Sequence, residues 1–140
     1  MIHGQMAKYV QALAPISVAG GAAATTTEID TVGFDHAEFI VCLGLIPSTG
    51  VATVKLQESD AAGSGQADIT GGGFVAPVDA DDGKILCAFI DLRYRKRYLT
   101  LVITNGATNA SLLSSIVRLS RAEQVPSTAA TRNLKEQLFL

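Results

Sequence analysis

Tryptophan is absent from this chain of 140 residues, and histidine and cysteine each occur only twice. A metal-binding jelly roll needs several histidines and a carboxylate at one cavity, and His3 and His36 are far apart in sequence. A Ser-His-Asp triad is disfavoured by the same shortage, because His36 would have to be the base and no serine lies in a nucleophile-elbow pattern. We therefore expect a protein that is not an enzyme, with no catalytic residue, metal or cofactor.

Charged residues are also scarce, at 17% of the chain, and the net charge is −2. Such a small charge argues against wholesale binding to nucleic acid or to acidic membranes. No apolar run reaches the length of about 18 residues that a membrane span needs, so we expect no membrane partner. The apolar fraction of 48% is high, and it indicates that other chains cover part of the apolar surface.

Cys42 and Cys87 lie in the apolar contexts FIVCLG and KILCAF. Free cysteine packs as a small hydrophobic residue, so we interpret both as buried reduced thiols. A disulfide would require their Cα atoms to lie within about 7 Å, and spacing in the sequence does not decide this. Two cysteines so far apart do not make a zinc site.

Short segments of β-forming residues, separated by glycine-rich turns, dominate the chain. Residues 37–45 and 84–90 read as strands buried on both faces, whereas residues 51–59 alternate and predict one wet face. Pro15 would confine the strand at 9–18 to a sheet edge or end it there. Residues 110–121 fit a helix or a strand, and we favour a strand that returns beside residues 98–104. The remaining predicted strands are 25–31 and 98–104, with a possible short one at 67–70.

These segments predict an all-β protein, a β-sandwich or jelly-roll-like single domain with extended N- and C-terminal arms. We expect an N-terminal arm at residues 1–8, the sandwich at 9–123 and a C-terminal arm at 124–140.

An acidic turn, Asp79 to Gly83, offers oxygen ligands that suit Ca²⁺ if Asp68 or Asp91 lies nearby. Its spacing is not that of an EF-hand loop, because no glutamate stands at the twelfth position. We interpret the segment as a solvated turn.

The sharpest candidate for a functional site is the basic stretch at residues 93–98, which joins two predicted strands. It admits three interpretations: contacts to a nucleic-acid backbone, salt bridges between subunits, or charges that keep a strand end soluble. The low net charge counts against nucleic acid, and we favour the subunit interface. The candidate interface residues in it are Arg93, Tyr94, Arg95, Lys96, Arg97 and Tyr98.

Several segments resemble a family of small head proteins of tailed bacteriophages that are encoded near the major capsid protein. The resemblance runs from about Val10 to Ala130, and its most specific pieces are KLQESD at 55–60 and RKRYLTLVIT at 95–104. The other similar segments are VQALAP, EIDTVGFDHAEFIVCLG and SRAEQVPSTAA.

The resemblance implies a capsid decoration, or cement, protein with a β-sandwich or jelly-roll fold. Such a protein is made in the cytoplasm of the bacterial host and sits as a homotrimer on the outside of the phage head, where capsomers meet. Its partners would be the major capsid protein and its own copies. The ending LKEQLFL departs from the family pattern, and its apolar residues Leu134, Leu138 and Phe139 are further interface candidates.

Two other functions compete with this one. A β-sandwich that binds glycans or a host surface would need loop aromatics, and the chain has only three tyrosines. A small trimeric enzyme of the dUTPase type fits the length and strand content, but the nucleotide motifs with glycine and aspartate are not visible.

Overall fold

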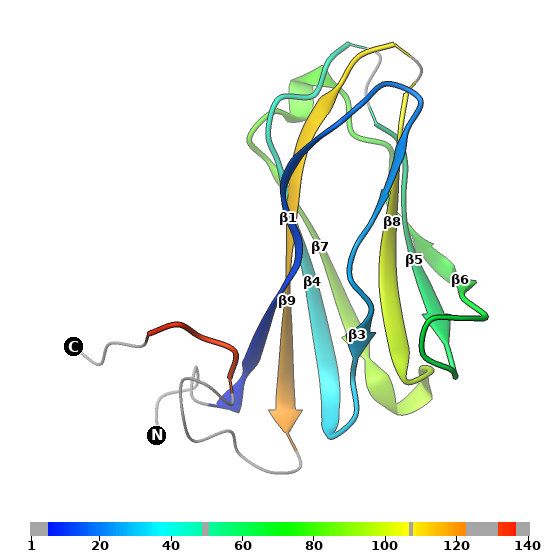
Figure 1. Ribbon diagram of the computed structural model, residues 1–140, viewed down its shortest axis with the longest axis vertical. Coiled ribbons are helices and arrows are strands. Elements are labelled where there is room, and N and C mark those ends of the chain that lie inside the picture. Colours follow the sequence, from blue (N-terminus) through cyan, green and yellow to red (C-terminus); the bar gives the residue numbers. More distant parts are fainter. Residues whose placement is uncertain (1–5, 49–50, 107, 123–131, 137–140) are drawn as a thin grey trace.

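The computed structural model describes residues 6–48, 51–106, 108–122 and 132–136. Figure 1 shows two antiparallel sheets packed as layers, with the strands running along the long axis. The four-stranded sheet has the order β1 (Lys8–Val18), β9 (Ser111–Ala122), β4 (Phe34–Leu43) and β7 (Ile85–Asp91). The second sheet has the order β2 (Ala23–Thr25), β8 (Tyr98–Asn105), β5 (Val51–Ser59) and β6 (Ala67–Gly73), and β3 (Ile29–Asp30) also pairs with β8.

The strand pairs are nested along the chain. β1 pairs with β9, β2 and β3 pair with β8, β4 pairs with β7, and β5 pairs with β6. Two further pairs, β4–β9 and β5–β8, then join these strand pairs into the two sheets. This is the double-sheet arrangement of a jelly roll, and the predicted all-β sandwich is confirmed.

The core lies between the sheets and is built from alternate residues of their strands. Leu99, Leu101 and Ile103 of β8 are fully buried, as are Phe39 and Val41 of β4. The predicted alternation of β5 is confirmed, since Val54 and Leu56 are buried while Thr53 is exposed. The segment predicted at 110–121 is the strand β9, as expected, but the predicted pairing with residues 98–104 was wrong, because β9 lies between β1 and β4 in the other sheet.

Several predicted strands have different limits in the structure. The segment 25–31 is split into β2 and β3, because the Thr26 hydroxyl accepts a hydrogen bond from Leu101 N at 2.9 Å and replaces a backbone carbonyl. The possible strand at 67–70 continues to Gly73, where it pairs with Lys55.

The prediction that residues 37–45 and 84–90 are buried on both faces was wrong. β4 and β7 are neighbours in the four-stranded sheet, and only their inward residues are covered by the other layer. On the outward side, Ile85 is 62% exposed and Phe89 is 71% exposed. Cys42 and Cys87 are free, as predicted, but they are half-buried rather than buried.

Of the two alternatives for the first strand, the edge position is observed, and the strand continues past Pro15 to Val18. β1 is the outermost strand of its sheet, and its register with β9 shifts between Leu13 and Ile16, which flank Pro15. A proline is tolerated there because its missing N–H is not needed for a ladder bond.

Candidate interaction surfaces

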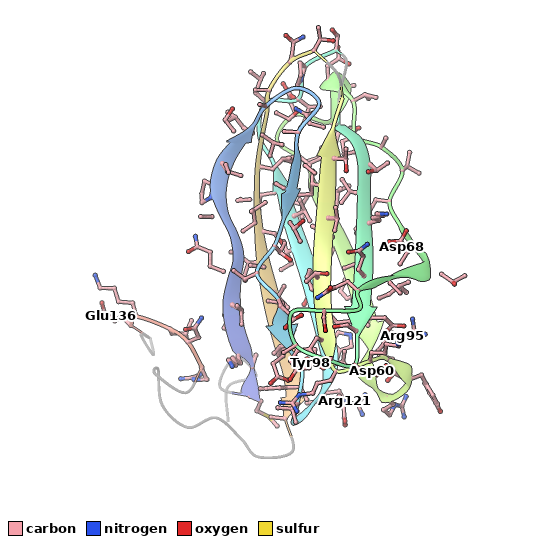
Figure 2. All side chains as sticks on the ribbon, turned by 45° about the vertical axis from the view of Figure 1, so that its right-hand side comes forward. Asp60, Asp68, Arg95, Tyr98, Arg121 and Glu136 are labelled. Atoms are coloured by element: carbon pink, nitrogen blue, oxygen red, sulfur yellow. The ribbon has the colours of Figure 1, made fainter. Side chains whose placement is uncertain are left out.

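The basic stretch lies at the end of the sandwich where β7 passes into β8. A short 3-10 turn, η3 (Leu92–Tyr94), follows β7. Its first residue, Leu92, is buried and packs in the core. Asp91 caps it by accepting a hydrogen bond from Arg93 N at 3.1 Å. Figure 2 shows Arg95, Asp60 and Tyr98 gathered at this end of the molecule. We name residues 91–98 the basic turn.

Each of the four cations in the basic turn has an acidic partner within the chain. Arg93 pairs with Asp91, and Arg95 lies 3.6 Å from Glu58. Lys96 and Asp60 are 2.8 Å apart, and Arg97 and Asp30 are 2.7 Å apart. The four cations of the basic turn therefore meet acidic residues from β3, β5, the segment after β5 and the end of β7.

Three of these pairs shift the pKa of at least one partner. The hydrogen bond from Arg93 lowers the pKa of Asp91 to about 2 from its usual 3.8. The hydrogen bond from Arg97 likewise lowers the pKa of Asp30, and Asp60 raises the pKa of Lys96. Most of the charges remain partly exposed, so water screens each pair and its contribution to stability is small.

The basic turn is therefore a set of largely exposed ion pairs and not a patch of unpaired positive charge. Tyr94 is 80% exposed, and the Arg97 guanidinium lies 5.0 Å from the centre of the Tyr98 ring. Phosphate binding relies on uncompensated cations, so the pairing removes the main reason to expect nucleic acid here. That the turn contacts another subunit stays a prediction.

The candidates in the C-terminal segment are placed only in part. Leu134 is half-buried, whereas Leu138 and Phe139 lie outside the described residues. The carbonyl of Arg132 accepts a hydrogen bond from Tyr9 N at 3.0 Å, and Arg132 is 3% exposed. Residues 132–136 accordingly lie beside the start of β1, as Figure 1 shows in red.

The aspartates of the acidic turn accept hydrogen bonds from neighbouring groups of the chain. Asp82 accepts a hydrogen bond from Ile46 N at 2.6 Å, and Asp81 accepts from Val78 N and Lys84 Nζ. Asp68 instead pairs with Lys55 on the second sheet. No group of three or more His, Cys, Asp or Glu that could hold a metal ion occurs in the part of the chain that the structure describes.

His36 lies on β4 at the surface, half-buried. Its Nδ1 is 3.3 Å from the Ser120 hydroxyl, and its ring stacks on Phe89 at 6.4 Å between centroids. Among the described residues there is no helix with the length and apolar character needed to cross a membrane.

The outward side of the four-stranded sheet is a second surface, which the sequence reading did not locate. We name it the apolar face. Four of its large residues are 42–71% exposed, namely Ile85, Phe89, Leu112 and Ile116. Between them lie three half-buried apolar residues, Ile40, Cys42 and Cys87.

The register arranges the apolar face in rows across the strands. Ile116, Ile40 and Cys87 form the central row, and Ser114, Cys42 and Ile85 form the next. On the other side, Arg118, Glu38 and Phe89 stand level, and Arg118 Nη1 lies 3.3 Å from Glu38 Oε2. In these rows the apolar face thus has an apolar centre, and the ion pair between Arg118 and Glu38 stands beside it.

The second sheet has a different outward side. There Thr53, Lys55 and Gln57 of β5 point away from the core, and Lys55 and Gln57 bind Asp68 of β6. A polar outward side is what a solvated sheet usually shows. The apolar face is therefore a property of one sheet, and contiguous exposed apolar surface of this kind marks binding sites.

The alternation of Ile85, Cys87 and Phe89 could have revealed the apolar face. It was hidden because the alternate residues Leu86, Ala88 and Ile90 are apolar as well. A strand that is apolar on both sides looks the same in sequence whether a second layer covers one side or two.

Comparisons with known proteins show the fold. No family profile and no curated protein matches the chain. The crystal structure of the PBSX exported protein XepA is similar over 100% of this chain, with a TM-score of 0.58 and 15% identity. The chain spans 44% of that protein's length. A protein of the disulfide-linked pili that form Bacillus endospore appendages is also similar, with a TM-score of 0.43 and 18% identity, over 86% of this chain and 94% of that one.

Proposed function

We propose that this chain is a structural protein of a phage particle, a decoration protein that binds the outer surface of the head. The observation that carries the proposal is the apolar face, on which large apolar side chains stand exposed on a rigid sheet. A domain that can bury its own core has no internal need for such a surface, so a partner protein is its natural cover.

Two further observations support a phage particle. The segments KLQESD and RKRYLTLVIT resemble the decoration family, and they fall on β5 and β8, adjacent strands in the second sheet. The sandwich also has the fold of XepA, a PBSX phage exported protein. In this role the chain works by binding and not by catalysis.

The proposed partners are the major capsid protein and further copies of this chain. Many modest contacts repeated over a shell sum to strong attachment through avidity. The resemblance implies three copies per assembly, and light scattering measures that number.

Co-sedimentation with phage heads tests the proposal. The purified chain is mixed with heads assembled from the major capsid protein of the same phage, and heads are pelleted away from free protein. We expect saturable binding with a fixed number of copies per head. A chain that stays in the supernatant at all concentrations would contradict the proposal.

The basic turn gives a second experiment on the same assay. Replacing Arg93, Arg95 and Arg97 with alanine should leave the sandwich folded, because their pairs are exposed, and should weaken assembly if the turn contacts a neighbour. Unchanged binding to heads would show that these arginines do not contact a neighbour and serve only to keep the strand end soluble.

A hollow of about 320 Å³ favours a second candidate, a glycan- or host-surface-binding module. It lies between β6 and β7, and Phe74, Phe89, Asp91 and Arg95 are among its lining residues. A sugar ring could stack on such aromatic side chains while the charged groups accept and donate hydrogen bonds. Reproducible binding on a glycan array, with no binding to heads, would favour this candidate instead.

A further inference from the structure

The apolar face has a composition that restricts what covers it. Its charged groups in the described rows, Glu38 and Arg118, are already paired at 3.3 Å, so the face offers no net charge to a polyanion or an acidic membrane. Its centre is instead a flat set of aliphatic, thiol and aromatic groups. Such a surface fits another sheet packed face to face, as in the core of a sandwich.

The arrangement of the rows makes the face complementary to itself. Consider a two-fold axis that lies in the plane between the two facing sheets, parallel to the strands and midway between β9 and β4. Rotation about it places β4 of the second copy over β9 of the first and keeps the rows level. In the central row, Ile116 would then meet Ile40 of the second copy and Ile40 would meet its Ile116. In a two-fold interface every contact occurs twice in this way.

The charged row obeys the same symmetry. Arg118 would lie over Glu38 of the second copy, and Glu38 over its Arg118, so two ion pairs become a square of alternating charges. If the second copy were turned end for end instead, the ion pairs would face an apolar row. Burial of an ion pair against an apolar row costs desolvation and gains no new charged partner, so the alternating arrangement is preferred.

The edge strands also match. β7 would lie over β1 of the second copy, which places Phe89 near its Tyr9, since Tyr9, Arg118, Glu38 and Phe89 are level across the sheet. Ile85 would reach the irregular part of β1, where Pro15 and Ser17 line a hollow together with Cys42 and Ser114. An exposed side chain on one copy thus faces a recess on the other.

We infer that the apolar face binds the same face of a second copy, forming a two-fold pair through β9 and β4. Four strands about 4.8 Å apart and seven residues of about 3.4 Å each give a flat footprint of roughly 400 Å² per copy. The two copies together cover roughly 800 Å², below the roughly 1,200–2,000 Å² of stable interfaces, so the pair is weak and forms in a concentration-dependent manner. The pair occupies the apolar face, so a pair bound to a head would contact it through other surfaces such as the basic turn. It differs from the trimer that the family resemblance implies.

Mass measurement by sedimentation equilibrium tests the pair directly. The wild-type chain of 14.6 kDa should double its mass as concentration rises. Ile116→Glu and Phe89→Glu should raise the dissociation constant by about tenfold or more, the usual effect of changing a central interface anchor. Val75→Glu is the matched control, because Val75 is 92% exposed and lies outside the apolar face, and it should leave the mass unchanged.

A charge swap between copies identifies the symmetry. Glu38→Arg alone and Arg118→Glu alone should each be monomeric, because like charges then oppose each other across the axis. Mixing the two variants should restore a pair of mixed composition, since a copy with two arginines in the charged row then faces a copy with two glutamates there. Native mass spectrometry reads the composition, and thermal unfolding confirms that each variant is folded.

Several results would overturn the inference. These are a wild-type chain that is monomeric or trimeric at all concentrations, a pair that resists Ile116→Glu and Phe89→Glu, or single charge variants that do not complement each other. A monomeric wild type whose head binding is lost in Ile116→Glu would assign the face to the capsid protein, and would also overturn the pair. Because head binding is scored separately with the wild type, failure of the proposed function is distinguished from failure of the pair.

Discussion

Asn105 is the residue with the most concentrated set of hydrogen bonds in the described core. It is 3% exposed, and its amide donates to the carbonyls of Val18, Ala19 and Asn109 at 2.7–3.3 Å. Its Oδ1 accepts from the Ser111 hydroxyl at 2.9 Å. One side chain therefore joins the end of β1 to the turn between β8 and β9, a role that the sequence, which shows only a turn-forming asparagine, could not reveal.

Asn105→Ala should destabilise the fold by about 1–3 kcal/mol, because buried carbonyls and a hydroxyl lose their partner. Chemical denaturation of the variant measures the loss. Asn109→Ala is the control, since the carbonyl that Asn109 contributes to the network belongs to the backbone. Equal stability of Asn105→Ala and wild type would contradict this account of the residue.

Asp91 and Asp30 make the stability of the basic turn depend on pH. Their pKa values are lowered in the folded state, that of Asp91 from 3.8 to about 2, by Arg93 and Arg97 respectively. A lowered folded pKa means that the unfolded chain binds protons first on acidification. The pairs therefore stabilise the fold above about pH 4, and this stabilisation is lost as the pH falls towards 2.

Arg93→Gln should make the fall in Tm between about pH 4 and pH 2 less steep, because Asp91 then titrates near its unfolded value. Wild type and variant should converge at the acid end of the range. Lys135→Gln removes a positive charge away from the turn and serves as the control. A difference between wild type and Arg93→Gln that widens on acidification would contradict the assigned pair.

At the scale of the strand, the alternation of apolar and polar residues was the main basis for predicting which side chains are buried. β5 and β8 have one apolar and one polar or mixed side, and the single wet face that alternation predicted for β5 is observed. β4 and β7 are apolar on both sides, so burial of their outward residues was predicted and is wrong. The break between β2 and β3 depends on the Thr26 hydroxyl, a tertiary contact to Leu101 that local propensity cannot show.

Leu101→Ala in the centre of β8 should destabilise the sandwich by about 2–5 kcal/mol, because it opens a cavity at a fully buried position. Val102→Ala, one position along the same strand and half-buried on the opposite side, should cost far less. Denaturant titration compares the two variants. Similar losses would show that the second sheet does not bury the side that the structure assigns.

At the scale of the whole molecule, the sequence predicts the class of fold and the position of the basic turn, but not the acidic partners of that turn or the apolar face. The type of the strands and most of their positions follow from turn residues and apolar runs. Placing Asp30, Glu58 and Asp60 beside the basic turn requires the strand order, because these residues are distant in sequence. The apolar face likewise requires β9 to lie beside β4, which periodicity does not specify.

Deleting residues 124–140 should leave the sandwich folded, because both sheets are complete by Ala122. Loss of the bond between Tyr9 N and the Arg132 carbonyl should cost about 1 kcal/mol. If the segment acts as an arm on the head, its deletion also lowers the number of copies bound. A truncated chain that does not fold, judged by circular dichroism, would place the segment in the core.

Electron cryo-microscopy of phage heads, with and without the added chain, tests the central claim most directly. If the chain decorates the head, the difference map should show the two-layered sandwich at fixed lattice positions on the outer surface. A difference map without ordered density, from heads incubated with saturating protein, would contradict the account.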